Sequence, residues 1–171
     1  QTDLELIKKE TPTQRVLEIS ITAPTAAPRI TRPSLNLAMV LDRSGSMSGQ
    51  KIEFAKKAAD HVLSMLQESD KAALVAFDDQ VLSLSPSQAV TDEGRLWLRD
   101  QLSRLKPGGQ TNLSGGWLQG CQLVAGASRD GVINRTLLLT DGLANVGITD
   151  MEELGFHARE IHNRGVSTST F

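Results

Sequence analysis

The chain has 171 residues, of which 39% are hydrophobic, and 18 Lys and Arg against 20 Asp and Glu give a net charge of −2. The length predicts a globular fold with a sizeable core, and the lack of a basic excess argues against nucleic-acid and membrane-surface binding. No apolar stretch approaches the roughly 20 residues that cross a bilayer, so direct membrane insertion is not expected.

The N-terminal segment has a different texture from the rest of the chain. Residues 4–7 and 14–22 are predicted to be strands, because apolar and polar residues alternate in the second stretch. A segment with three prolines in a dozen residues follows and is typical of a linker. We therefore expect an N-terminal β extension with a linker over 1–34 and a second domain over 35–171.

Strands and helices alternate after this linker. The nearly continuous apolar run LNLAMVLD, residues 35–42, predicts a strand buried on both faces of a parallel sheet. Apolar residues at spacings of three and four predict a helix over 50–68. A second apolar strand is expected at 71–77, and a turn at 78–80 leads to an alternating edge strand at 81–85.

The second half of the chain continues the alternation. We expect a helix over 91–105, a glycine-rich loop over 107–116, a helix over 117–127, a strand over 134–141, a helix over 150–164 and a strand from 166 to 171. This order predicts a doubly wound α/β fold. Its sheet would be mostly parallel, with one antiparallel edge strand and helices on both faces.

Oxygen-bearing side chains gather where the buried strands end. Two of these strands finish in Asp42 and Asp141, Ser44 and Ser46 follow the first, and Thr111 lies in the glycine-rich loop. The carboxyl ends of parallel strands share one edge of the sheet, so all five side chains are expected there. With neither His nor Cys among them, the set suits a hard cation, Mg²⁺ first and Mn²⁺ or Ca²⁺ as alternatives.

Other interpretations of these residues stay open at this point. Asp42 could be an N-cap for the next helix, and the whole domain could be structural with an unused site. A metal-dependent phosphohydrolase is a further alternative. However, GSMSGQK matches neither a phosphate-binding loop nor a nucleophile elbow. No His lies in the motif loops to serve as a base.

The motifs DRSGSM, QTN and LTDG, at residues 42–47, 110–112 and 139–142, resemble the von Willebrand factor type A domain and its metal-ion-dependent adhesion site (MIDAS). The stretches KIEFAKKAADHVL, DKAALVAFDD, LKPGGQTNLSGGWLQG and LLLTDGLANVG are similar to this family in the same order. The resemblance covers about residues 35–171, and its style is similar to bacterial and inter-alpha-inhibitor-like members.

The resemblance implies a function and a role for each site residue. Ser44, Ser46 and Thr111 would touch the metal, whereas Asp42 and Asp141 would act through water and through hydrogen bonds. An acidic side chain of a protein partner would fill the open coordination position. The expected function is therefore a metal-dependent protein–protein interaction module for adhesion or scaffolding, not an enzyme.

The sequence departs from the family pattern in two ways. The family fold normally continues after the last predicted strand with a helix, a strand and a closing helix, so the domain is expected to be truncated at its C-terminal side. The segment 1–34 is additional to the family fold.

Several single residues receive a structural interpretation. Arg43 is expected on the surface, with pairing to a partner's acid as the alternative, and Asp78 and Asp79 are expected in a turn. Trp117 is expected to pack in the core, or else at an interface rim, and Cys121 is expected to be a small buried residue. His61, His157 and His162 fall on predicted helices without a second ligand at a metal-binding spacing.

Overall fold

The computed structural model describes residues 19–20, 32–142 and 144–171. The chain divides into two units, 1–32 and 33–171, and the following description concerns the second. The strands predicted at 4–7 and 14–22 and most of the linker lie outside the described residues. Ile19 and Ser20, which are described, belong to no helix or strand.

The second unit is built on one five-stranded sheet with the spatial order β3-β2-β1-β4-β5. Its strands are β1 (Leu35–Asp42), β2 (Lys71–Phe77), β3 (Val81–Ala89), β4 (Ile133–Leu139) and β5 (Val166–Thr170). The pairs β1–β2, β1–β4 and β4–β5 are parallel, whereas β3 runs antiparallel to β2 at the edge. The predicted mixed sheet is thus confirmed.

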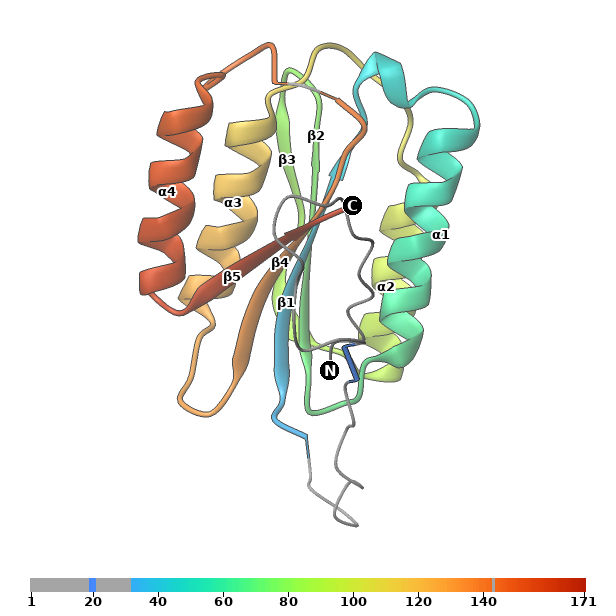
Figure 1. Ribbon diagram of the computed structural model, residues 1–171. Helices are drawn as coiled ribbons and strands as arrows, with labels where there is room; N and C mark the ends of the chain where they lie inside the picture. Colours follow the sequence, from blue (N-terminus) through green and yellow to red (C-terminus); the bar gives the residue numbers. More distant parts are fainter. Residues whose placement is uncertain (1–18, 21–31, 143) are drawn as a thin grey trace, which may run out of the picture. The chain divides into compact units, whose positions relative to one another are not determined.

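Four helices cover the two faces of this sheet. They are α1 (Gln50–Met65), α2 (Asp92–Ser103), α3 (Leu113–Gly126) and α4 (Met151–Asn163), and a short 3₁₀ turn, η1 (Gly45–Met47), precedes α1. The helices α1 and α2 lie on one side of the sheet, and α3 and α4 lie on the other (Figure 1). This arrangement confirms the predicted doubly wound α/β fold. Among the described residues, no helix has the length and apolar character needed to cross a membrane.

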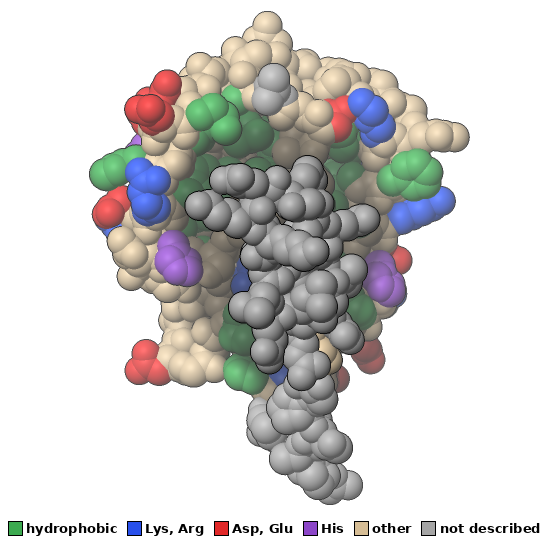
Figure 2. Space-filling view, viewed as in Figure 1, with side chains coloured by type: hydrophobic (Ala, Val, Ile, Leu, Met, Phe, Trp, Pro, Cys, Tyr) green, Lys and Arg blue, Asp and Glu red, His purple; other side chains and the backbone are tan. Residues whose placement is uncertain are grey.

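The central strand β1 is buried on both faces, which explains its continuous apolar sequence. Leu37, Met39 and Leu41 pack into the cluster that includes α1 and α2. Ala38 and Val40, which point the opposite way, pack into the cluster that includes α3. On the visible face of the molecule, charged side chains lie mainly on the flanks over α4 and α1 (Figure 2).

The start of α3 differs from the sequence-based expectation, because the helix begins at Leu113 and not at Trp117. The glycines that suggested a loop are required by packing. A Cβ at Gly116 would lie only 2.4 Å from the ring of Phe77, so α3 can approach β2 there only with glycine. The side chain of Asn112 caps the helix by accepting a hydrogen bond from the Gly115 amide.

Further along α3, Trp117 and Cys121 face the core, each 4% exposed, as predicted. The indole of Trp117 donates a hydrogen bond of 2.9 Å to the Thr168 hydroxyl. Burial raises the pKa of the Cys121 thiol, although hydrogen bonds from Thr136 and Thr168 oppose that effect. Cys121 is therefore a buried, protonated core residue.

The topology singles out the carboxyl end of β1. From β1 the chain passes through α1 to β2 on one side, and after α3 it returns to β4 on the other side. Loops leaving β1 and β4 therefore diverge toward opposite faces of the sheet. Such a switch point is where ligands bind in open α/β sheets.

Candidate functional site

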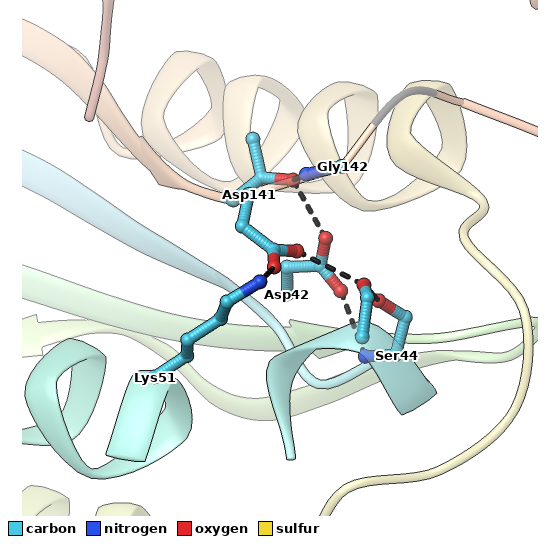
Figure 3. A network of polar contacts seen from close by, with 7 residues as sticks. Asp42, Ser44, Lys51, Asp141 and Gly142 are labelled. Atoms are coloured by element: carbon cyan, nitrogen blue, oxygen red, sulfur yellow. Dashed lines mark hydrogen bonds and ion pairs between the residues drawn. The ribbon is translucent and has the colours of Figure 1, made fainter. Parts of the chain in front are cut away.

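Asp42 closes β1 at this switch point, and its carboxylate is fully buried. One carboxylate oxygen accepts a hydrogen bond of 2.7 Å from the Ser44 amide, and the other accepts one of 2.6 Å from the Thr140 hydroxyl. These two donors come from the loops after β1 and β4. They fix the direction in which the carboxylate points into the space between the loops (Figure 3).

The two serines after Asp42 face the same space. The 3₁₀ turn η1 curls the chain so that the Oγ atoms of Ser44 and Ser46 lie 3.1 Å apart. Ser46 also donates a hydrogen bond of 3.0 Å to a carboxylate oxygen of Asp141. Ser44 is buried and Ser46 is exposed, so the oxygen atoms lead from the interior to the surface.

Thr111 approaches from the glycine-rich loop and is buried. Asn145 holds Thr111 in place through two hydrogen bonds. The side-chain oxygen of Asn145 accepts one of 2.7 Å from the Thr111 amide, and the backbone amide of Asn145 donates one of 3.1 Å to the Thr111 carbonyl. Gly142 shows how close the loops come. A Cβ there would lie 3.7 Å from Asp42 Oδ2 and Thr111 Cγ2 and 3.8 Å from Ser46 Oγ.

The structure therefore brings all five predicted residues together. Asp42, Ser44, Ser46 and Asp141 are joined by hydrogen bonds, and Thr111 meets them at Gly142.

Lys51 is a member of this cluster that the sequence interpretation missed. It lies in the first turn of α1, and its ammonium forms an ion pair with the Asp141 carboxylate (Figure 3). The hydrogen bond from Lys51, together with one from Ser46, outweighs partial burial and lowers the pKa of Asp141. The sequence carried no local signal for this contact, because Lys51 and Asp141 are 90 residues apart in the chain.

The structure also corrects the expectation that Arg43 lies on the surface. Its side chain is only 19% exposed and forms an ion pair of 2.7 Å with Asp78, so Arg43 does not simply lie on the surface. Asp78 is in the predicted turn, where it accepts a hydrogen bond from the Gln80 amide. It is nevertheless buried, because the glycine-rich loop covers it.

Three supporting residues also escaped the sequence interpretation. Thr140 orients Asp42, Asn145 anchors Thr111, and the Gly142 amide donates a hydrogen bond of 3.2 Å to the Thr140 hydroxyl. Thr140 and Gly142 flank Asp141 within LTDG, so the motif held a signal for both. Asn145 gave none, because its role depends on which loop it meets.

The donor set has the chemistry of a site for a small, hard cation. It offers two carboxylates and three hydroxyls, and among the described residues no group of three or more His, Cys, Asp or Glu side chains is clustered for metal binding. The 3.1 Å between the Oγ atoms of Ser44 and Ser46 is close to the roughly 2.9 Å between neighbouring ligands of octahedral Mg²⁺. His61 lies in α1, and His157 and His162 lie in α4, outside the loops of this site.

Comparison with known sequences points to one family. Residues 37–143 match the family model described as the von Willebrand factor type A domain. An uncharacterized protein of Synechocystis sp. is 36% identical over 80% of this chain and 32% of its own length. The inter-alpha-trypsin inhibitor heavy chain H1 of Sus scrofa is 32% identical over 79% of this chain and 16% of its own length. The chain thus spans a third or less of these relatives.

Solved structures share the fold. A von Willebrand factor type A protein from Catenulispora acidiphila superposes with a TM-score of 0.67 at 21% identity, over 80% of this chain and 33% of that one. Proximal thread matrix protein 1 from the mussel byssus superposes with a TM-score of 0.66 at 18% identity. The match covers 81% of this chain and 38% of the mussel chain. Because the family model covers most of β1, the glycine-rich loop and β4 in one continuous match, the chain belongs to the von Willebrand factor type A domain family.

Proposed function

We propose that this domain is a metal-dependent protein–protein interaction module. The carboxyl edge of the sheet binds one divalent cation, Mg²⁺ first and Mn²⁺ or Ca²⁺ as alternatives, and through it an acidic side chain of a partner protein. The observation that carries this proposal is the convergence of five oxygen-bearing side chains from three separate loops at the switch point.

Each residue has a distinct part in this proposal. Ser44, Ser46 and Thr111 provide neutral hydroxyl oxygens, which bind the cation without cancelling its charge. Asp42 and Asp141 balance that charge and orient the hydroxyls through hydrogen bonds, as Asp141 already does with Ser46. The cation supplies the positive charge that an incoming carboxylate needs.

The relatives support a binding role. Domains of this family typically mediate protein–protein adhesion, and the matched structures include a type V pilus tip protein and a minor pilin. The mussel protein was solved with a zinc-occupied MIDAS motif. The loops of the site also match neither a phosphate-binding loop nor a nucleophile elbow, which favours binding over hydrolysis.

The proposal is tested by comparing wild type with Asp42→Asn, which keeps the shape of the side chain but removes its charge. Asp60→Asn is the matched control, because Asp60 pairs with Arg99 between α1 and α2. Thermal unfolding is followed with Mg²⁺, with Mn²⁺ and with EDTA. Proteins from the source organism are then captured on each immobilised variant under the same conditions.

We expect both cations to raise the melting temperature of wild type and Asp60→Asn but not that of Asp42→Asn, because a ligand of the native state stabilises it. Captured partners should be lost in EDTA and on Asp42→Asn. Partners that persist in EDTA would contradict the proposal. An unchanged melting temperature in saturating cation would indicate a structural domain, and turnover of phosphate esters would indicate a phosphohydrolase.

A further inference from the structure

The loop that carries Thr111 is fastened to two other loops near the site. The Gly108 amide donates a hydrogen bond of 2.6 Å to the Arg43 carbonyl, and the Gly45 amide donates one of 2.9 Å to the Gly109 carbonyl. The Asn112 amide donates one of 2.7 Å to the Asp78 carbonyl. The position of Thr111 therefore depends on contacts with the loop after β1 and with the β2–β3 turn.

One ion pair lies at the centre of these contacts. Arg43 Nη2 lies 2.7 Å from Asp78 Oδ2, and Arg43 Nη1 donates to the Lys106 carbonyl at 3.4 Å. Asp78 Oδ2 also accepts a hydrogen bond of 3.2 Å from the Gly109 amide. The pair thus touches residues 106–109 from two sides, just before Thr111.

The carboxylate of Asp78 is held in its charged form. Burial raises its pKa, but hydrogen bonds from the Gln80 and Gly109 amides and the charge of Arg43 outweigh burial, so the pKa lies below its ordinary value. The Asp78 side chain is 4% exposed. A buried charge that is this well paired is costly to disturb, so the contact fixes the loop firmly.

Two glycines show how closely the loop is seated on this turn. A Cβ at Gly108 would lie 2.0 Å from Asp78 Oδ2, and a Cβ at Gly109 would lie 2.0 Å from Asp79 Oδ1. Only glycine permits such an approach without a shift of backbone or carboxylate. The buried and paired Asp78 carboxylate therefore limits how residues 108–109 can move.

We propose that Arg43 and Asp78 are positioning residues for the Thr111 ligand. Their ion pair holds residues 106–112 against the loop after β1, so that the Thr111 side chain stays near Gly142, as Ser46 and Asp42 do, before any cation arrives. Asn145 provides the second anchor on the far side of Thr111. This inference rests on the proposed function, because positioning matters only if Thr111 binds a cation.

The pair is poorly suited to serve stability alone. Arg43 Nε is buried and has no hydrogen-bond partner among the described residues. Replacing Arg43 with Met removes this unsatisfied group and keeps much of the side-chain volume. Removal of Arg43 alone, however, leaves the buried Asp78 carboxylate without its cation and is expected to lower stability, whereas replacement of both members of a buried ion pair is often close to neutral. The double variant Arg43→Met/Asp78→Asn removes both charges and keeps an oxygen acceptor for the Gly109 amide, so cation binding and stability should separate in it.

The test measures the dissociation constant of Mn²⁺ by electron paramagnetic resonance for wild type and five variants. These are Arg43→Met, Asp78→Asn, Thr111→Ala and the double variants Arg43→Met/Asp78→Asn and Arg43→Met/Thr111→Ala. Arg99→Met is the matched control, because the Arg99–Asp60 ion pair joins α1 and α2 away from these loops. Urea unfolding gives the stability of each variant. Hydrogen exchange of the Gly109, Thr111 and Asn112 amides is measured without metal.

We expect Arg43→Met, Asp78→Asn and Arg43→Met/Asp78→Asn each to weaken Mn²⁺ binding by about tenfold or more, as loss of a residue that orients a metal ligand does. The double variant should do so with stability close to that of wild type. Arg99→Met should bind as wild type does. Adding Arg43→Met to Thr111→Ala should cause little further loss, because residues that act through one another are not additive. Loop amides should exchange faster in Arg43→Met and Asp78→Asn.

Wild-type affinity in Arg43→Met and Asp78→Asn would overturn the inference, and so would full additivity in the double variant. If the wild type binds no Mn²⁺, the proposed function fails. The exchange rates then still decide whether the pair holds the loop, and unchanged rates would show that it does not.

Discussion

The two ends of β1 carry a fully buried polar side chain each, Asn36 at the amino end and Asp42 at the carboxyl end. Asn36 donates to the Val124 carbonyl at 2.8 Å and to the Asn134 side chain at 2.9 Å, and it accepts from Ser87 at 2.8 Å. Its donors are thus matched by acceptors. Asp42 instead lies in a cluster rich in oxygen acceptors that opens toward the surface at Ser46. Burial of a polar group therefore does not mark a site, whereas the convergence of oxygen atoms from several loops does.

The largest predicted effect comes from substituting the buried polar residue at each end of β1 in turn. Asp42→Asn should weaken Mn²⁺ binding by about a hundredfold. Asn36→Leu should leave that affinity unchanged but lower the free energy of unfolding by about 1–3 kcal/mol for each buried polar partner left unsatisfied. Calorimetric titration and urea unfolding measure the two quantities. A loss of Mn²⁺ affinity in Asn36→Leu would erase the distinction between the ends.

The close contact between Gly108 of the glycine-rich loop and Asp78 provides the next test. Gly108→Ala places a Cβ against Asp78, so we expect it to displace the loop, weaken Mn²⁺ binding and cost about 1–3 kcal/mol. Gly126→Ala is the control, because a Cβ there meets nothing within 4 Å and should stabilise slightly. Calorimetric titration with Mn²⁺ and urea unfolding check both variants. Equal Mn²⁺ affinities in Gly108→Ala and Gly126→Ala would mean that the contact between Gly108 and Asp78 does not position Thr111.

Substitution of Lys51 should change the Mn²⁺ affinity by less and in the opposite direction. Its ammonium lies on Asp141 and repels a cation bound at the same carboxylate, so Lys51→Met should strengthen Mn²⁺ binding by about threefold to fivefold. The side chain is 58% exposed, and solvent screening keeps the effect modest. Lys57→Met, on the same helix, is the control. Weaker binding in Lys51→Met would instead make Lys51 part of the ligand-binding surface.

The smallest expected effect is on the pH dependence of stability. The pKa values of Asp78 and Asp141 are lower in the folded chain than their ordinary values near 3.8. Their contribution is therefore fully present above the unfolded pKa and is lost as the pH falls through the folded pKa. Urea unfolding between pH 6 and pH 3 should show this decline, and Arg43→Met and Lys51→Met should each flatten it. An identical decline in all three proteins would argue against both ion pairs.

Much of the fold could be predicted because the buried strands have simple patterns. The apolar runs that became β1 and β2 have the predicted bounds, since burial on both faces confines polar residues to the strand ends and to Asn36 beside the first of them. The start of α3 could not be predicted. Its glycines are typical of a loop, and only the contact between Gly116 and Phe77 explains them.

The candidate site divides in a similar way. Asp42 and Asp141 could be placed together because each follows a buried strand, and parallel strands end at one edge of the sheet. The roles of Lys51 and of the Arg43–Asp78 pair could not be predicted from the sequence. They depend on contacts between segments that are 35 to 90 residues apart in the chain. No local pattern determines which loops meet, so these residues appear only once the loops are packed.

The central claim is that one divalent cation binds at the carboxyl edge of β1, and an anomalous difference map from crystals grown with Mn²⁺ tests it most directly. We predict one peak enclosed by the hydroxyls of Ser44, Ser46 and Thr111 in the wild type, and no peak there in Asp42→Asn. A map without a peak at this edge, or with its strongest protein-bound peak elsewhere, would contradict the account.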